Sequence, residues 1–221
     1  MNDLSIRKDR RAGRITLTRP QALNALTHEM AVAIHRALDD WRGDPDVALV
    51  IIDAEGDRAF CAGGDIRMIA ESGAGDASEA KAFFLAEYRL NHLMFEYPKP
   101  ITAIVDGIVM GGGVGISEPA KVRIATERTT YAMPETGIGL FPDVGGGWFL
   151  PRLPGQTGVW LALTGARLKA ADTVALGIHT HFVDSGAIGA LTGELLAAPA
   201  DPEAVADRVS GDAGTAPLGA H

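Results

Sequence analysis

The sequence contains a single cysteine, Cys61, and fewer basic than acidic residues. A lone cysteine excludes any disulfide within the chain, so we expect a reducing compartment, with the cytoplasm as the default. The formal net charge is −8, from 20 lysines and arginines against 28 aspartates and glutamates. Such a charge disfavours nucleic acids and anionic membrane surfaces as partners.

Long apolar runs are also missing. The most apolar stretch, residues 101–116, is interrupted by Asp106 and by several glycines, so it does not predict a membrane-spanning helix. The N-terminal residues lack the apolar core of a signal peptide. With 221 residues, 47% of them hydrophobic, the chain can instead form one substantial globular core.

Three common glycine motifs are absent as well. The chain has no G-x-G-x-x-G for dinucleotides, no G-x-x-x-x-G-K-[ST] for nucleotide phosphates, and no G-x-S-x-G nucleophile elbow. Their absence disfavours these three nucleotide-binding and hydrolytic classes.

An apolar strand, a glycine turn and a helix follow one another at residues 47–71 and again at 101–120. This alternation predicts an α/β fold with helices on one or both faces of a sheet. We expect the core to occupy residues 1–190. Residues 191–221 are rich in alanine, glycine, proline and aspartate, and they predict one short helix followed by an unstructured end.

Two glycine turns each stand between an apolar strand and a helix: CAGGD at residues 61–65 and MGGGVG at 110–115. At such positions the N–H groups of the first helical turn are free, and the helix dipole favours negative charge. A tight strand-to-helix connection explains one such turn equally well. Two turns in one domain favour a functional role, because two backbone N–H groups can hold one oxyanion.

The motifs FCAGGD, GIVMGGGVG and AMPETGIGLFPDVGGG resemble those of the crotonase superfamily of acyl-coenzyme A enzymes, from about Ile15 to Asp184. Within it, the chain is most similar to the subfamily of 3-hydroxyisobutyryl-CoA hydrolases, which act in valine degradation. The resemblance implies a crotonase-like spiral of repeated ββα units. It also implies that the C-terminal helical part is truncated, with residues 191–221 as its short remnant, and that a homo-oligomer is possible.

The resemblance implies roles for individual residues. The thioester oxygen would lie between the backbone N–H groups of Gly64 and Gly112. Glu135 would be the active-site glutamate and Asp143 the second carboxylate of the hydrolases, while Glu87 would contact the substrate. Glu87 also lies in an apolar helical stripe, where a carboxylate needs either a partner or a tip that reaches solvent.

The other substrate contacts implied by the resemblance lie in one loop. Its residues would border the adenine and pantetheine of coenzyme A: Ala62, Gly63, Gly64, Asp65 and Ile66. Coenzyme A is then part of the substrate, and we expect no separate cofactor. We expect no metal site, because His179 and His181 have no cluster of cysteines or acids nearby. Cys61 is expected to be a small buried hydrophobe.

One departure from the superfamily pattern bears on the reaction. Enoyl-CoA hydratases of the superfamily carry a second glutamate in the pattern GGGxE, whereas Gly115 stands at that place here. Hydration needs a base for water and an acid for the α-carbon, so the loss of this glutamate favours another reaction. Asp143 supplies an acid from elsewhere, and two nearby carboxylates push their pKa values apart. The pair suits attack on a thioester, with Glu135 either activating water or forming a transient anhydride.

Three interpretations of the function stay open. The first is an acyl-CoA thioester hydrolase, and the second is an enoyl-CoA hydratase or isomerase with altered acids. The third is a catalytically inactive acyl-CoA-binding paralogue. Structural roles are the alternative for each acid: Glu135 can complement a helix start after Pro134, and Asp143 can be a turn residue after Pro142.

Overall fold

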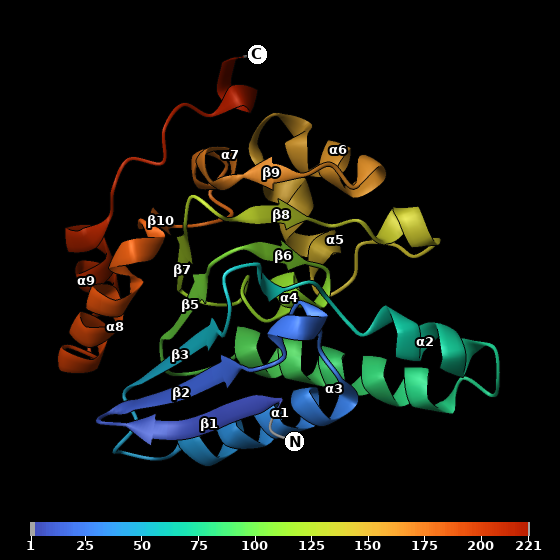
Figure 1. Cartoon of the computed structure of the whole chain (residues 1–221), viewed down its shortest axis with the longest axis horizontal. Coiled ribbons are helices and arrows are strands. Elements are labelled where there is room, and N and C mark those ends of the chain that lie inside the picture. Colours follow the sequence, from blue (N-terminus) through green and yellow to red (C-terminus); the bar gives the residue numbers. More distant parts are fainter. Residues whose placement is uncertain (1–2, 221) are drawn as a thin grey trace.

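The computed structural model describes residues 3–220, and its strands form two sheets (Figure 1). A six-stranded sheet has the order β1-β2-β3-β5-β7-β10, and a four-stranded sheet has the order β4-β6-β8-β9. The strands are β1 (Leu4–Asp9), β2 (Ala12–Leu17), β3 (Leu49–Ala54), β4 (Ala59–Cys61), β5 (Ile101–Val105), β6 (Ile108–Met110), β7 (Val122–Ala125), β8 (Thr130–Ala132), β9 (Leu168–Lys169) and β10 (His181–Phe182).

Helices connect and cover the strands. The α-helices are α1 (His28–Arg42), α2 (Ile66–Gly73), α3 (Ser78–Phe95), α4 (Gly112–Gly115), α5 (Gly146–Phe149), α6 (Thr157–Thr164), α7 (Ala170–Ala175), α8 (Ile188–Ala197) and α9 (Pro202–Val209). The 3-10 helices are η1 (Pro20–Ala22), η2 (Glu135–Ile138), η3 (Leu150–Arg152), η4 (Pro154–Gln156), η5 (Ser185–Ala187) and η6 (Pro217–Ala220).

From β3 to β8, consecutive strands alternate between the two sheets, which produces a spiral. β3, β5 and β7 pair in parallel in the large sheet, and each is followed directly by β4, β6 or β8 of the small sheet. After β4 and β6, helical segments return the chain to the large sheet. The predicted α/β spiral of ββα units is therefore confirmed. Because β4 and β6 are neighbours in the small sheet, the glycine turns that follow them meet at the same edge.

The first four residues of β3, Leu49 to Ile52, are all apolar, and their positions in the structure explain why. Side chains of a strand point alternately to opposite faces. Val50 and Ile52 lie in the main core, which also contains residues of α1 and α3, whereas Leu49 and Ile51 face a second core on the other side of the sheet. A strand covered on both faces has no solvent side, so polar alternation is absent.

Helix α1 fixes the position of α3, which carries Glu87. Its start follows the expected signal, because the Thr27 hydroxyl accepts a hydrogen bond from the Met30 N–H at 3.2 Å. Apolar residues spaced along α1, including Ile34 and Leu38, are buried. They join the core that also contains Phe83 and Leu90 of α3, so the two helices pack against each other.

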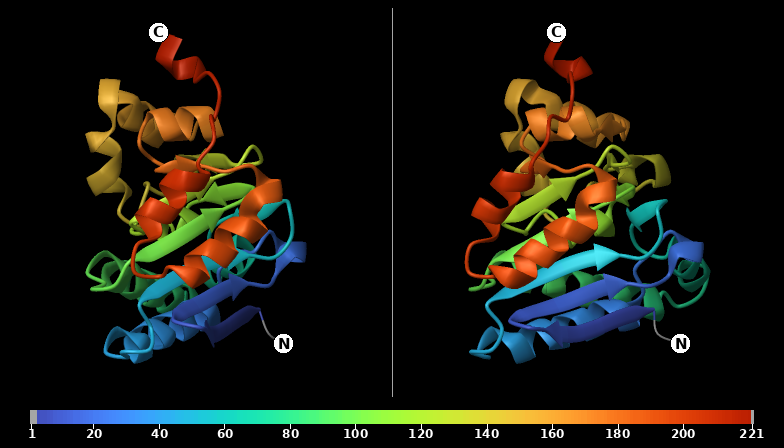
Figure 2. Two further views of the ribbon diagram at one scale, coloured as in Figure 1. Left: turned by 90° about the vertical axis from the view of Figure 1, so that its left-hand side faces the viewer. Right: turned by 60° about the vertical axis from the view of Figure 1, so that its left-hand side comes forward.

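The C-terminal stretch differs from its prediction of one short helix and an unstructured end. Helices α8 and α9 both form and lie across the outer face of the large sheet, as the orange and red ribbons of Figure 2 show. Leu191 and Leu195 of α8 and Val205 of α9 are fully buried in the second core. Asp201 caps α9 by accepting from the Ala204 N–H at 3.2 Å. The expected boundary between residues 190 and 191 falls inside α8.

Several apolar side chains are exposed around α5 and α6. Phe95, Phe141, Trp148 and Leu163 each expose more than half of their surface. Among residues 3–220, no helix combines the length and apolar character needed to span a bilayer.

Removing a large side chain from the second core should destabilise the protein. We expect Leu195→Ala to lower the free energy of unfolding by about 2–5 kcal/mol, because it leaves a cavity between α8 and the sheet. The matched control Leu163→Ala removes a side chain that is 71% exposed, and its effect should stay within about 0.5 kcal/mol. Chemical denaturation measures both, and equal effects of the two variants would contradict the packing of α8.

Candidate active site

The two predicted glycine turns lie beside each other. Gly64 forms a parallel bridge with Leu26, whose N–H donates to the Gly63 carbonyl at 2.8 Å. A β-carbon added at Gly63 would lie 3.6 Å from the Gly112 nitrogen, and one added at Gly112 would lie 3.3 Å from the Gly64 nitrogen. Within the described part of the chain, neither the Gly64 nor the Gly112 N–H donates to a protein acceptor. Both amides therefore retain a free hydrogen-bonding capacity.

The three predicted carboxylates gather around this pair of turns. Glu87 on α3 is 2% exposed, Glu135 at the start of η2 is 5% exposed and Asp143 is 9% exposed. A β-carbon added at Gly112 would collide with Glu87 Oε1, and one added at Gly111 would lie 3.0 Å from Glu135 Oε1. Glu87 and Glu135 thus both approach the second glycine turn, and Glu87 does not reach solvent.

The carboxylates of Glu87 and Glu135 are short of hydrogen-bond partners. Glu87 Oε1 and both Glu135 oxygens are buried and, as far as residues 3–220 are concerned, accept no hydrogen bond. Leaving such atoms unpaired costs free energy, and native proteins rarely do so without a reason. A purely structural role in capping or turn formation does not explain these buried, unpaired oxygens.

Burial and mutual repulsion change the ionisation of the three acids. Burial raises the pKa of Glu87 to about 8, and the neighbouring charges of Asp143 and Glu135 add to the shift. Burial also raises the pKa of Glu135 to about 7, again with a contribution from Asp143. The pKa of Asp143 is raised by burial, although a hydrogen bond from Tyr88 opposes the shift. At neutral pH the site therefore holds both protonated and ionised carboxyl groups.

Two residues of α3 that sequence reasoning missed complete the site. The Tyr88 hydroxyl donates to Asp143 Oδ2 at 2.6 Å, and Asn91 Nδ2 donates to the Gly115 carbonyl at 3.0 Å. Both follow Glu87 in the same helix, and this closeness to a predicted site residue was the one signal in the sequence that could have pointed to them. Their partners lie far away in the sequence, which is why no local pattern pointed to them.

A cavity of about 790 Å³ opens at Asp143. Tyr88 and Asn91 form part of its wall, and much of the remainder is aromatic: Phe95, Phe141, Trp148 and Phe149. Glu118 also lines it, and burial raises the pKa of this carboxyl to about 7 while Arg123 opposes the shift. The cavity offers an apolar space with a few polar groups, which is typical of small-molecule sites.

The loop from Ala62 to Ile66 leads from β4 into α2. The Asp65 carboxylate caps α2 by accepting from the Met68 N–H at 3.4 Å, and it forms an ion pair with Arg19 at 3.3 Å. Ile66 is 49% exposed at the start of the helix. Asp65 therefore has a structural role here.

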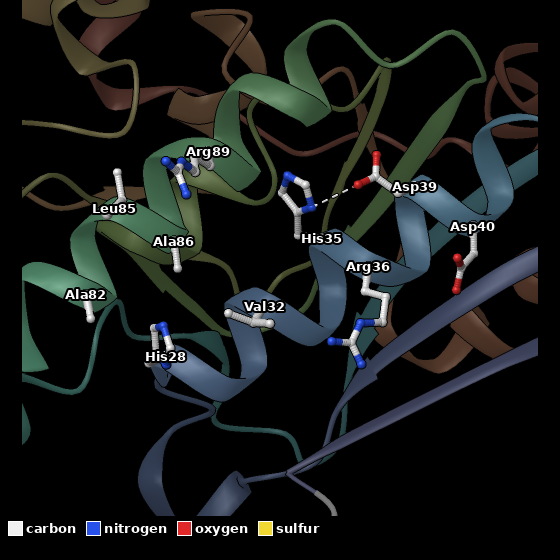
Figure 3. Close-up of a pocket in the computed structure, with 10 residues that line it drawn as sticks. All are labelled: His28, Val32, His35, Arg36, Asp39, Asp40, Ala82, Leu85, Ala86 and Arg89. Carbon is white, nitrogen blue, oxygen red and sulfur yellow. Dashed lines mark ion pairs between the residues drawn. The ribbon is translucent and has the colours of Figure 1, made fainter.

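A second groove of about 560 Å³ is lined by residues of α1 and α3 (Figure 3). His35 lies 3.2 Å from Asp39 within it, and Arg36 and Arg89 also line its walls. None of the predicted site residues lines this groove. It therefore lies apart from the acids and glycine turns.

The remaining chemically interesting side chains have structural surroundings. Cys61 is buried, and burial raises the pKa of its thiol to about 12, so the thiol stays protonated. Burial lowers the pKa of His179 to about 3, and His181 Nε2 lies 3.0 Å from Asp207 Oδ1. The described residues contain no group of three or more histidines, cysteines and acids arranged to hold a metal ion.

The sequence profile of the enoyl-CoA hydratase/isomerase family matches residues 12–217, so the chain belongs to this family. Among solved structures, a carnitinyl-CoA dehydratase from Mycobacterium thermoresistibile is 40% identical with a TM-score of 0.95, covering 100% of this chain and 64% of that one. An enoyl-CoA hydratase from Rhodobacter sphaeroides 2.4.1 is 44% identical with a TM-score of 0.85, and the match covers 95% of this chain and 67% of that one. The predicted superfamily and fold are confirmed.

Curated relatives carry a more particular name. A protein of Gallus gallus named "3-hydroxyisobutyryl-CoA hydrolase, mitochondrial" is 50% identical over 195 residues, which are 88% of this chain and 51% of the relative. Proteins of the same name from Danio rerio and Homo sapiens are 54% and 53% identical, over 84% of this chain and 49% and 48% of their own lengths. The chain thus spans about half the length of these relatives.

These names correct one expectation. The relatives are named as mitochondrial, so the cytoplasmic assignment made from the single cysteine is wrong. A lone cysteine excludes only a disulfide framework, and it does not distinguish one reducing compartment from another.

The raised pKa of Glu87 should appear in the pH dependence of stability. Between the ordinary pKa of a glutamate, 4.5, and the pKa of about 8 in the folded protein, the folded protein keeps a proton that the unfolded chain has released. The free energy of unfolding should therefore fall as the pH rises through this window and level off above it. Glu87→Gln stays neutral at every pH. Its free energy of unfolding should therefore rise relative to that of the wild type between pH 4.5 and 8.

Chemical denaturation at a series of pH values measures this difference. Glu79→Gln, an exposed glutamate on the same helix, is the control and should run parallel to the wild type. If Glu87→Gln also ran parallel, the pKa of Glu87 would not be raised in the folded protein.

Proposed function

We propose that this chain is the catalytic part of an acyl-CoA thioester hydrolase that acts on 3-hydroxyisobutyryl-CoA. The observation that carries the proposal is the set of buried carboxylate oxygens of Glu87 and Glu135 that lack partners beside two free backbone amides. Curated relatives at 50–54% identity bear the name of this hydrolase, which supports the substrate. Coenzyme A belongs to the substrate, and the proposal needs no other cofactor.

In the proposed reaction the thioester carbonyl oxygen accepts hydrogen bonds from the Gly64 and Gly112 amides. The nucleophile, either water or a carboxylate, adds to the carbonyl carbon, and the negative charge that develops on the oxygen is stabilised by these two donors. The carbon–sulfur bond then breaks, and the sulfur leaves as the coenzyme A thiol after taking up a proton. Each preorganised donor of this kind contributes about 3–4 kcal/mol to lowering such a barrier.

Glu135 is the group proposed to start the reaction. A pKa of about 7 leaves much of it ionised at neutral pH and yet basic enough to accept a proton from water. Two routes remain open: Glu135 removes the proton of the attacking water, or its carboxylate attacks the thioester and water hydrolyses the resulting anhydride. In both routes Asp143 orients the water or the hydroxyl of the substrate.

Glu87 is proposed to bind the substrate as a neutral acid. With a pKa of about 8 its carboxyl group carries a proton at neutral pH and can donate a hydrogen bond. The loop from Ala62 to Ile66 follows β4 and contains Gly64. This loop is proposed to border the coenzyme A part of the substrate. Hydration of an enoyl-CoA is the competing activity, since the similar solved structures are named a dehydratase and a hydratase.

Neutralising either catalytic acid should abolish most of the activity. We expect Glu135→Gln and Asp143→Asn each to lower kcat for thiol release from 3-hydroxyisobutyryl-CoA by about 10²–10⁴-fold. Glu135→Gln removes the base or nucleophile, and Asp143→Asn removes the carboxylate that orients the water or the substrate hydroxyl. A thiol reagent follows the release of coenzyme A. Glu79→Gln controls for loss of a surface charge and should keep the wild-type rate.

The same assay with crotonyl-CoA separates hydrolysis from hydration. Wild-type hydrolysis rates in both acid variants would refute the proposed roles. Hydration of crotonyl-CoA by the wild type, with no thiol release from any thioester, would show that the chain is a hydratase and not a hydrolase. Binding of acyl-CoA without any turnover would favour the inactive paralogue.

Removing the hydroxyl of Tyr88 should shift the pH profile. Its hydrogen bond to Asp143 favours the ionised carboxylate, so Tyr88→Phe should raise the pKa of Asp143. The contribution of Asp143 to the fall of kcat on the acid side should then move to higher pH. Tyr97→Phe, which removes a hydroxyl bonded to the Leu38 carbonyl in another region, should leave the profile in place. Equal profiles for all three proteins would exclude a positioning role for Tyr88.

A further inference from the structure

Asp143 begins a tight turn whose second residue has a strained backbone. Val144 has a φ of 42° and Gly145 a φ of 96°, and the Gly146 N–H donates to the Asp143 carbonyl at 2.6 Å. Two positive φ angles in succession define a type I′ turn, which favours glycine or asparagine. A β-branched residue in this region costs roughly 1–3 kcal/mol and persists only where the surroundings impose it.

Val144 packs against Gly115 at the end of α4, where the lack of a side chain leaves room for it. A β-carbon added at Gly115 would lie 2.7 Å from Val144 Cβ and 2.9 Å from Asn91 Nδ2. Val144 is only 7% exposed. The Asn91 amide also donates to the Gly115 carbonyl at 3.0 Å, so both side chains lie where a β-carbon at position 115 would need room.

This contact joins α4 to two segments that bear acids, α3 with Glu87 and the turn with Asp143. Asn91 lies one helical turn after Glu87 on α3, and Tyr88 of the same helix donates to Asp143. Gly112 at the other end of α4 faces Glu87, as described above. Helix α4 therefore meets α3 and the Asp143 turn through glycines at both of its ends.

We propose that Val144 and Asn91 are positioning residues that seat the Asp143 turn on Gly115 and so hold the Asp143 carboxylate beside Glu87 and Glu135. This contact of Val144 and Asn91 with Gly115, called the seat below, also determines which reaction the site catalyses. While Val144 and Asn91 fill the space beside position 115, α4 cannot carry an acid there, and the acid that works with Glu135 comes from the turn. This inference rests on the proposed hydrolase function.

A double-mutant cycle on Gly115 and Val144 tests the seat. Gly115→Ala places a methyl group against Val144 and should displace Asp143, lowering kcat for thiol release about 100-fold with KM changed less than about threefold. Val144→Gly leaves the turn unseated and should lower kcat about fivefold. In Gly115→Ala/Val144→Gly the methyl group meets only the end of the flexible Asn91 side chain, which can shift, and kcat should return to within about fivefold of Val144→Gly.

Two further readouts separate positioning from a general loss of structure. Gly115→Ala should shift the acid limb of the pH profile upward as Tyr88→Phe does, because Asp143 moves away from the tyrosine hydroxyl. Gly193→Ala adds a methyl group to α8 with no heavy atom within 4 Å, and it should leave kcat, KM and the pH profile unchanged.

Several outcomes would overturn the inference. Wild-type kcat in Gly115→Ala or in Val144→Gly would show that the seat is not needed. A Gly115→Ala defect that Val144→Gly does not repair would show that the effect does not act through Val144. If Gly115→Ala fails to fold, the double variant must still fold and turn over, and its failure to do so would also refute the seat.

A different result would refute the proposed function rather than the seat. If the wild type releases no thiol, the hydrolase proposal fails and thermal unfolding of the same four proteins still reports on the contact. Non-additive effects of the two substitutions on Tm would then support the packing of Val144 on Gly115, and additive effects would refute it.

Discussion

The side-chain-free surface of α4 is the feature on which the candidate site depends. Gly112 allows the Glu87 carboxylate and the Gly64 amide to approach the backbone, and Gly115 accepts Val144 and Asn91. A β-carbon at either position would collide with a neighbour. Glycine is used here for close approach rather than for flexibility, since neither residue needs a positive φ. The two ends of a single helical turn thereby connect α3 to the acid-bearing turn.

Gathering three acids in a buried site has an energetic cost. Burial raises the pKa values of Glu87, Glu135 and Asp143, and the unpaired oxygens of the two glutamates lower stability further. The rest of the molecule offsets this cost through ordinary packing, with one core around α1 and α3 and a second beneath α8 and α9. Such locally unfavourable arrangements are expected where chemistry, rather than stability, determines the residue.

Local patterns predicted the elements well where one physical signal dominated. The Thr27 cap and the apolar spacing after it predicted α1, and the continuous apolar run predicted β3 as a strand covered on both faces. The prediction was wrong for α9, because its alanine- and proline-rich composition hides a helix that becomes stable by packing Val205 against the sheet. Its Asp201 cap and Pro202 were the signals available.

The sequence alone determined the alternation of strand, glycine turn and helix and the family motifs, and it singled out three acids as candidates, because these depend on residues close together in the chain. Tertiary structure decided which of these residues meet. The hydrogen bond from Tyr88 to Asp143 joins residues 55 positions apart, and the seat of Val144 on Gly115 joins two turns that follow different strands. Such contacts arise only once the spiral brings successive units together, since local periodicity reports which face of an element is buried but not what lies against it.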